Sequence, residues 1–430
     1  MAARLISSGL TLLRHRLVKN TAALFVVQIS TYVAPLVVVP YLSRVLTTDH
    51  YGLINFAASF NWYFMTLVDY GFNLTATRRI AIHRDDPDKI SQIFSSVMAA
   101  KALLTLVGFL IMVSVVMATP KLRPNFPLFS LAYLQVLGDL LFPLWLFQGL
   151  QKMENLVWRD LSSKLLALGL VFAFVHRDAD YMLAAGFQFG STLLAGVIGL
   201  CTVPFLTPAR WVIPSVGEVF SALREGWPVF LSVAGVYLTA STNIMVLGLK
   251  GGPKDVAFYT AASRLVVALR TLVGPVVTAI YPHISHMASK SRQDAIAALR
   301  KYSLLLAAPF LAVSVVLLLG ATPIIRIISS AKYDPAIPLL RIMSFSPFFL
   351  AIQTVYSTFF MLAFGYEKAW SKFIIQSTIL NFVLLFPLLH FLWPPAGVAV
   401  AGLAVDVFVA IVTYTFYRKH SGDILELVPA

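Results

Sequence analysis

Residues 92–117 read QIFSSVMAAKALLTLVGFLIMVSVVM, an apolar run that a single charge, Lys101, interrupts. A helix of about 20 such residues crosses the hydrocarbon core of a bilayer, so this stretch predicts a transmembrane helix. Similar runs follow one another along the 430 residues, of which 59% are hydrophobic and 12% charged. A soluble domain is about a quarter charged. The sequence therefore predicts an all-α polytopic membrane protein with about twelve spans. The predicted spans are 21–42, 53–75, 92–117, 127–150, 156–175, 181–206, 227–249, 256–282, 302–325, 335–363, 371–393 and 396–417.

Several classes of function are disfavoured by the composition. Little polar sequence remains between the spans to build a large extramembrane enzyme domain. The net charge of +14 is typical of polytopic proteins, whose basic residues gather in cytoplasmic loops, and we do not interpret it as nucleic-acid binding. Cys201 is the single cysteine, and one thiol forms neither an internal disulfide nor a thiolate metal cage. We expect no nucleic-acid partner, no metal site and no cofactor.

The distribution of Lys and Arg predicts the orientation in the membrane. With the N-terminus in the cytoplasm, the cytoplasmic segments hold 21 of these residues and the outer loops hold 8. Basic residues favour the cytoplasmic side, so both termini are predicted to be cytoplasmic. Residues 5–17 place basic side chains on one side and leucines on the other, which predicts an interfacial helix before the first span.

Two halves of six spans each are indicated by weak internal repeats. The segment Asp49–Ser59 resembles Asp255–Ser263, and Gly149–Lys152 resembles Gly365–Lys368. Because six spans separate the members of each pair, the repeats run parallel, as in alternating-access carriers built from duplicated halves. We predict a first lobe over 1–206, a cytoplasmic linker over 207–226 and a second lobe over 227–430.

Cations inside the predicted spans are the first candidates for a binding site. Lys101 lies in the first half, and Arg264 and Arg270 lie in the second. Charges within a span are costly and seldom face lipid, and guanidinium groups match phosphate oxygens. We expect a cationic cavity between the halves for an anionic substrate. Structural ion pairs are the competing interpretation, and Arg341 is expected to snorkel to the outer interface.

Acidic residues in the spans are candidates for coupling to an ion. Asp139, Asp69 and Asp406 are the candidates, since a buried carboxylate can carry a proton when burial favours its neutral form. Asp139 is the preferred one, and proton, sodium and membrane potential all remain open as driving forces. The sequence contains no nucleophile elbow, phosphate loop, zinc motif or paired-carboxylate signature, so we predict a transporter and no enzyme.

Five ordered motifs carry a family resemblance over nearly the whole chain. They are Pro40-Tyr-Leu-Ser-Arg44 with Tyr51-Gly52, Asp69-Tyr-Gly-Phe72 with Thr77-Arg78, Phe147-Gln-Gly-Leu-Gln-Lys152, Tyr259-Thr-Ala-Ala-Ser-Arg264 and Phe364-Gly-Tyr-Glu-Lys368. In this order they resemble Wzx-type O-antigen and polysaccharide flippases, a branch of the multidrug/oligosaccharidyl-lipid/polysaccharide (MOP) exporter superfamily. The resemblance implies two pseudo-symmetric six-helix lobes. It also implies translocation of undecaprenyl-diphosphate-linked oligosaccharide from the cytoplasmic to the periplasmic face of the bacterial inner membrane.

With this resemblance, the intramembrane cations gain a specific role. Lys101, Arg264 and Arg270 are expected to contact the diphosphate or acidic sugars, with Arg44 near the outer mouth and Arg78 near the inner mouth. The family usually carries an acid-base pair where Ser263-Arg264 stands here. Expected partners are the lipid-linked oligosaccharide, membrane lipids, a polysaccharide polymerase and a chain-length regulator, and the protein itself is expected to be a monomer.

Two alternatives stay open. The first is a cation-coupled multidrug exporter of the same superfamily. Its cavity should carry more acid than base, whereas here the bases are at least as numerous. The second is a membrane-bound polysaccharide polymerase or acyltransferase, which needs a catalytic cluster on a sizeable outer loop. Every predicted outer loop is short.

Overall fold

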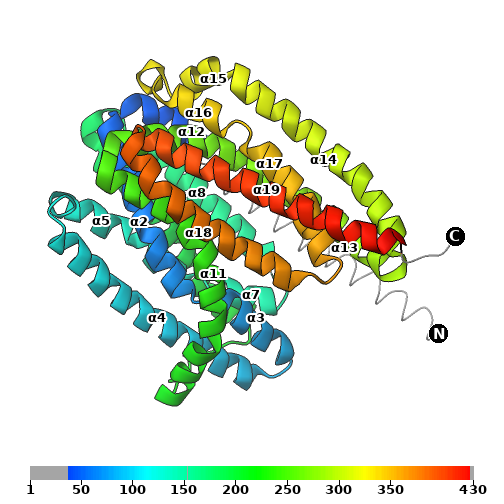
Figure 1. Ribbon diagram of the computed structural model, residues 1–430. Helices are drawn as coiled ribbons and strands as arrows, with labels where there is room; N and C mark the ends of the chain where they lie inside the picture. The colour runs from blue at the N-terminus through cyan, green and yellow to red at the C-terminus, as the bar shows by residue number, and fades with distance from the viewer. Residues whose placement is uncertain (1–36, 153, 427–430) are drawn as a thin grey trace. The chain divides into compact units, whose positions relative to one another are not determined.

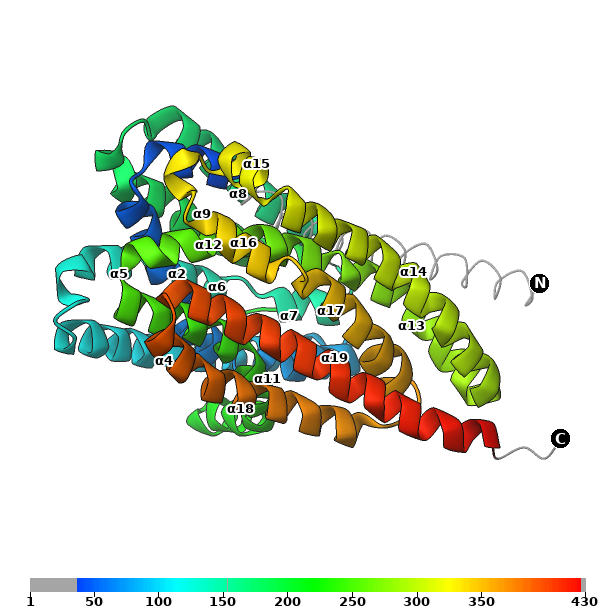
Figure 2. The same ribbon diagram turned by 45° about the horizontal axis from the view of Figure 1, so that its top comes forward.

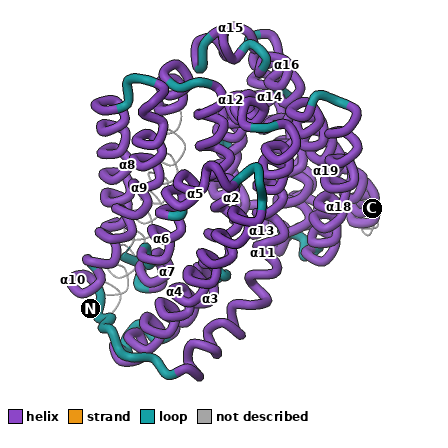
Figure 3. Tube along the Cα trace, turned by 90° about the vertical axis from the view of Figure 1, so that its left-hand side faces the viewer, coloured by secondary structure: helices purple, strands orange, loops and turns teal. Residues whose placement is uncertain are grey.

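A computed structural model describes residues 37–152 and 154–426 of the chain. Every regular element in these two ranges is a helix, and they contain no strand (Figures 1 and 3). The prediction of an all-α polytopic protein is confirmed. The predicted interfacial helix over 5–17 and most of the predicted span 21–42 lie outside the described residues.

The described chain divides into two compact units. The first holds Phe56–Ser241, and the second holds Val39–Asn55 together with residues 242–426. Two helices cross the division, α2 (Thr48–Asp69) and α11 (Val216–Gly251). The lobe boundaries at 206 and 227 stay a prediction.

The first unit contains an antiparallel pair of long helices, α8 and α9, which run side by side (Figure 3). Its apolar core lies around Phe72, Phe94 and Trp145, all of them buried. The elements assigned to it, besides parts of α2 and α11, are α3 (Phe72–Ile82), α4 (Pro87–Ala118), η1 (Arg123–Asn125), α5 (Phe126–Ala132), α6 (Leu134–Leu141), α7 (Leu144–Gly149), α8 (Glu154–Phe174), η2 (Asp178–Asp180), α9 (Tyr181–Cys201) and α10 (Val203–Leu206).

In the second unit, α18 and α19 form the corresponding long pair and are adjacent along their lengths (Figures 1 and 2). The core lies around Ile284, Val355 and Phe360, all of them buried. Its elements, besides parts of α2 and α11, are α12 (Pro253–Thr271), α13 (Val273–Lys290), α14 (Arg292–Leu319), α15 (Ala321–Ile328), η3 (Ala331–Tyr333), α16 (Ala336–Met343), α17 (Ser346–Thr354), the π-helix η4 (Val355–Leu362), α18 (Glu367–Phe391) and α19 (Pro394–Glu426).

Within the described residues, eight helical segments are long and apolar enough to cross a membrane. Each coincides with one of the predicted spans. The predicted spans 53–75, 156–175 and 227–249 are also largely helical. The eight segments are Pro87–Ala118, Arg123–Gly149, Asp178–Cys201, Pro253–Thr278, Arg292–Leu319, Ala336–Leu362, Glu367–Phe391 and Pro394–Ser421.

Several predicted spans are broken helices. The span 53–75 breaks at Tyr70 and Gly71, which have φ angles of 46° and 77°. The span 127–150 breaks at Phe142-Pro143, where proline cannot continue the ladder of hydrogen bonds. In membrane proteins such interruptions are tolerated where protein or a water-filled cavity surrounds the freed backbone. They often mark binding sites.

The second repeat predicted from the sequence has the same backbone in both units. The N–H of Lys152 donates to the carbonyl of Phe147 at 2.9 Å, and the N–H of Tyr366 donates to that of Met361 at 2.7 Å. The preceding residues, Gln151 and Gly365, both have positive φ angles, 57° and 85°. This hydrogen-bond pattern pairs Gln151 with Gly365. The structural register of the repeat is therefore two residues away from the register of the sequence match.

The start of α2 packs against the start of α12 at a position that only glycine fits. A Cβ at Gly52 would lie 1.8 Å from the carbonyl oxygen of Pro253. We expect Gly52→Ala to lower the thermal stability of the purified protein, by about 1–3 kcal/mol or more, because neither backbone can move away cheaply. The control is Gly169→Ala, where nothing lies within 4 Å of the added carbon. Equal melting temperatures for the two variants would contradict this account.

Candidate functional site

A buried ion pair lies inside the first unit. The ammonium group of Lys101, on α4, donates to the carboxylate of Asp139 at 3.1 Å and to the Asp139 main-chain carbonyl at 2.7 Å. The Lys101 side chain is 3% exposed and that of Asp139 is 27% exposed. The structure thus supports the competing interpretation for Lys101, because this cation already has an acidic partner.

Close packing of α6 on α9 fixes the position of Asp139. A Cβ on Gly138 would lie 2.4 Å from the carbonyl carbon of Thr192, and one on Gly196 would lie 2.4 Å from the oxygen of Gly138. Small residues allow membrane helices to approach this closely. Asp139 directly follows the contact and precedes the break at Phe142-Pro143 by three residues, so the carboxylate lies beside an interrupted helix.

A second acid joins this pair. Asp69 is the last residue of α2, at the Tyr70-Gly71 break, and interacts electrostatically with both Lys101 and Asp139. The Asn73 amide donates a hydrogen bond to its carboxylate across the break. Asp69 forms no direct ion pair with any described residue. Two acids and one base therefore meet in the first unit.

The second unit contains a different buried pair. The guanidinium of Arg270 donates to Asp406 at 2.6 Å and to the Ser346 hydroxyl at 2.5 Å. The Ser346 hydroxyl donates in turn to the same carboxylate. Arg270 is one residue before the end of α12 and Ser346 begins α17, whereas Asp406 lies within the continuous helix α19.

The two pairs have opposite polarity. In the first unit the base, Lys101, lies on a continuous helix and the acids lie next to breaks. In the second unit the acid, Asp406, lies on the continuous helix and the base lies next to a break. In each unit, a charge on a rigid helix is matched to an opposite charge on a segment whose backbone is interrupted.

Arg264 differs from the other two cations. Its guanidinium donates to the side-chain oxygen of Asn55 and lies 6.0 Å from the centre of the Tyr51 ring. Among the residues that the structure describes, no carboxylate pairs with it. The side chain is partly exposed. Since a charge in a span usually has a partner, Arg264 is the cation with free capacity for an anionic ligand.

Two tyrosine side chains near Arg264 have hydroxyl groups without a hydrogen-bond partner in the described structure. Tyr51 and Tyr333 pack edge to face with their centroids 6.1 Å apart, and Tyr333 interacts electrostatically with Arg264. Both residues are at most 2% exposed, and neither hydroxyl has a hydrogen-bond partner in the described structure. A buried hydroxyl without a partner is costly. Together with the guanidinium, these groups supply donors that suit a phosphate or carboxylate.

The loop that carries Tyr333 is held by a bidentate pair. Arg326 donates to the two carboxylate oxygens of Asp334 at 2.9 and 2.7 Å. These hydrogen bonds hold the pKa of Asp334 below its usual value, so the pair persists at neutral pH. This contact joins α15 to the residue that directly follows Tyr333.

The two residues predicted at the mouths of the cavity occupy different settings. Arg44 is exposed and donates to the carbonyl of Ile327 at 2.5 Å, near the C-terminus of α15. Lys332 donates in return to the carbonyls of Arg44 and Leu46. Arg78 is exposed on α3. Their roles as substrate contacts stay predictions.

Ser346, Asn55 and Tyr51 were not singled out from the sequence as site residues. Tyr51 belongs to a motif that carried the family resemblance, which was the available signal for it. Nothing in the local sequence pointed to Ser346 or Asn55. In residues 37–152 and 154–426, no group of three His, Cys, Asp or Glu side chains gathers as a metal site would require.

Solved structures with the same fold are transporters. The chain superposes on an inward-facing multidrug resistance MATE family transporter of the MOP superfamily, with a TM-score of 0.65 and 15% identity over 92% of this chain and 100% of that one. It also superposes on the lipid II flippase MurJ in an inward closed conformation, with a TM-score of 0.67 and 13% identity over 92% and 87%. The chain therefore has the fold of these two proteins.

Sequence comparisons identify the family. Residues 17–288 match the profile of the family described as "Polysaccharide biosynthesis protein". A protein of Escherichia coli (strain K12) named "Putative O-antigen transporter" is 33% identical over 402 residues, which are 94% of this chain and 97% of that protein. A protein of Shigella dysenteriae with the same name is 26% identical over 91% and 98%. The chain belongs to this family, the Wzx-type branch of the superfamily.

Proposed function

We propose that the protein is a flippase for lipid-linked oligosaccharide. Its substrate is an O-antigen or exopolysaccharide repeat unit on undecaprenyl diphosphate, which it moves from the cytoplasmic to the periplasmic face of the inner membrane by alternating access. The names of its relatives and the fold it shares with a lipid II flippase support this assignment. The Lys and Arg distribution predicts that both termini are cytoplasmic.

The observation that carries the proposal is that Arg264 has no carboxylate partner among the described residues. Of the three candidate cations within the predicted spans, Lys101 forms an ion pair with Asp139, and Arg270 forms one with Asp406. Arg264 has an amide and an aromatic ring as neighbours, with two buried tyrosine hydroxyls close by. A guanidinium binds phosphate oxygens in a bidentate geometry. In this proposal Arg264 binds the diphosphate or an acidic sugar of the substrate.

In this proposal the coupling ion binds to the acidic residues of the first unit. Asp69 forms no direct ion pair among the described residues. It lies at a helix break and interacts electrostatically with Lys101. Its formal charge makes the cluster of two acids and one base net negative. A proton or sodium ion that binds at Asp69 would neutralise the cluster. We therefore favour Asp69 over Asp139, which is engaged with Lys101.

Lipid-linked oligosaccharide in a deletion strain tests the function. A membrane-impermeant sugar-modifying enzyme would report on which face of the inner membrane the oligosaccharide lies. We expect accumulation on the cytoplasmic face and loss of surface polymer, both restored by the plasmid-borne gene. Unchanged glycan with altered drug sensitivity would instead identify a multidrug exporter. Accumulation of unpolymerised units on the periplasmic face would identify a polymerase.

A further inference from the structure

A cavity of about 850 Å³ opens in the first unit, and Lys101, Asp139 and Asp69 are not among the residues that line it. It lies between the first three turns of α4, the end of α9 with α10, and the segment 207–211 that follows α10. The volume is within the range of small-molecule sites, about 300–1,000 Å³. The Lys and Arg distribution assigns this end of the unit to the cytoplasmic side.

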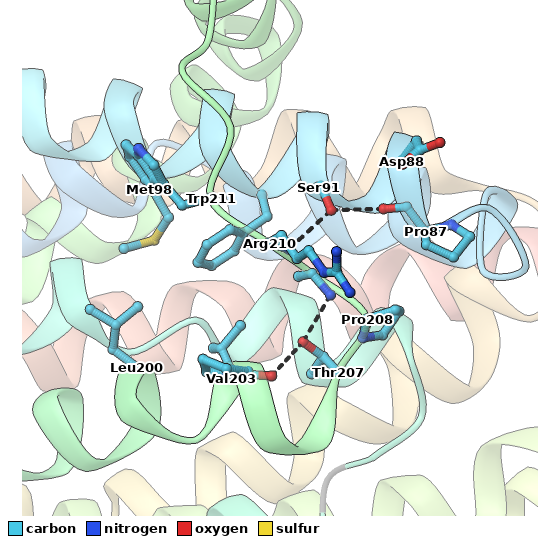
Figure 4. A pocket seen from close by; sticks show the side chains of 13 residues that line it. Pro87, Asp88, Ser91, Met98, Leu200, Val203, Thr207, Pro208, Arg210 and Trp211 are labelled. Atoms are coloured by element: carbon cyan, nitrogen blue, oxygen red, sulfur yellow. Dashed lines mark hydrogen bonds between the residues drawn. The ribbon is translucent and has the colours of Figure 1, made fainter.

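The cavity has an apolar end and a polar end (Figure 4). Met98 on α4 lies across the cavity from Leu200 on α9, and these side chains, with Val203, line the apolar end. Arg210 lies toward the other end, near Pro87 and Pro208. An elongated amphiphile would match this division.

Hydrogen bonds to α4 keep the third wall of the cavity in place. The backbone N–H of Arg210 donates to the Ser91 hydroxyl at 3.0 Å, and that of Val212 donates to the Ser95 hydroxyl at 2.9 Å. Ser91 and Ser95 lie one turn apart on the helix. The segment that carries Arg210 is therefore fixed to α4, and the cavity is a built feature of the unit.

Two charged side chains, Asp88 and Arg210, line the polar end, and in the described structure no hydrogen bond or ion pair joins them. The Arg210 side chain is exposed, and its guanidinium has no hydrogen bond or ion pair with the residues described. The Ser91 and Thr207 hydroxyls both donate to helix carbonyls, Pro87 and Val203. The guanidinium is thus the group at this end that remains available to an anion such as a phosphate.

Exposed apolar side chains occur from α10 to the start of α11, on and beside the cavity-lining segment 207–211. Phe205, Ile213 and Val216 are 86%, 88% and 84% exposed, and Trp211 is 61% exposed. Large apolar groups that face outward at the end of a span, with tryptophan among them, are typical of the membrane–water interface. The opening of the cavity therefore lies at the depth of the phospholipid head groups.

We propose that this cavity binds a phospholipid of the cytoplasmic leaflet. One acyl chain occupies the apolar end between Met98 and Leu200, and the phosphate contacts the Arg210 guanidinium. The cavity has an apolar lining and an unpaired cation, and its opening lies at the depth of the head groups. These three properties together match a phospholipid. The bound lipid packs against the segment that leads from α10 to α11, and so stabilises this part of the first unit.

Photo-cross-linking of the purified full-length protein in lipid nanodiscs tests this site. The probe is phosphatidylglycerol with a diazirine near the end of one acyl chain, and cross-linked residues are mapped by mass spectrometry. We expect cross-links at Phe94, Met98 or Leu200. Arg210→Gln should lower their yield about fivefold, the expected effect of one cation near the head groups. Diacylglycerol with the same photoreactive chain should cross-link at the level of this variant.

The matched control is Arg84→Gln, which removes an exposed arginine at the same end of the unit but outside the cavity. Its yield should equal that of the unchanged protein. Leu200→Trp, which fills the apolar end, should also lower the yield, and Arg210→Gln keeps the test valid if that variant folds poorly. Cross-links spread evenly over the lipid-facing helices, or an equal yield for Arg210→Gln and Arg84→Gln, would overturn the proposal.

Discussion

Replacing Asp139 with Leu is expected to destabilise the protein by about 3–5 kcal/mol, because it leaves the Lys101 ammonium buried without a carboxylate. Lys101 is almost inaccessible, whereas Asp139 keeps some exposure. The reciprocal variant Lys101→Met should therefore be less harmful, since water can still reach the Asp139 carboxylate. The double variant Lys101→Met/Asp139→Leu removes both charges and should recover most of the loss. Thermal unfolding of the detergent-purified variants, followed by size-exclusion chromatography, measures these differences.

An exposed pair provides the control for this cycle. Lys254 and Asp49 are 3.6 Å apart, with side chains 63% and 52% exposed. Asp49→Leu should change stability by less than about 1 kcal/mol, as is usual for surface ion pairs. If Asp139→Leu were no worse than Asp49→Leu, or if the double variant were as unstable as Asp139→Leu, the buried pair would not be a stabilising unit.

Arg264→Ala is expected to lower transport about ten- to one-hundredfold without loss of protein from the membrane. The estimate follows from the removal of a charge-assisted interaction worth about 1.5–3 kcal/mol. Because Arg264 has no carboxylate partner among the described residues, its removal leaves no acid unpaired. Arg264→Lys should retain part of the activity, since an ammonium keeps the charge but loses the bidentate geometry. Surface polysaccharide in a complemented deletion strain is the readout, with immunoblots for protein level.

Arg341→Ala is the matched control for Arg264. Arg341 is also an arginine within a predicted span of the second unit, but it is exposed and lies 3.5 Å from the Thr322 hydroxyl. Its removal should leave surface polysaccharide unchanged. Normal polysaccharide in Arg264→Ala would remove the basis for substrate binding at this residue. A fall in protein level that matched the fall in polysaccharide would point to folding instead.

The spans were predictable from the sequence because hydropathy over about 20 residues follows directly from the thickness of a bilayer. The breaks were harder to predict. Hydropathy averaged over 53–75 does not reveal the break at Tyr70-Gly71, although these two residues separate α2 from α3. Proline gave a usable signal at Pro143, where the backbone lacks a donor.

The charged residues were also identified from the sequence, but their partners were not. Lys101 and Asp139 are far apart in the chain, and their contact depends on how α6 packs against α9 at Gly138 and Gly196. That packing holds Asp139 where its carboxylate can pair with Lys101. Sequence reasoning therefore placed Lys101, Arg264 and Arg270 in one group, whereas the structure separates Arg264 from the two paired cations.

The matching turns at Gln151 and Gly365 affect how the two halves of the chain should be aligned. One turn has a glycine in the left-handed conformation and the other has a glutamine, yet both make the same hydrogen bonds. The course of the main chain is thus more alike at these two turns than the residues along it. Alignments of the two halves, and of distant relatives, should be anchored on such chain reversals before side chains are compared. Otherwise, equivalent positions will be misassigned by two residues.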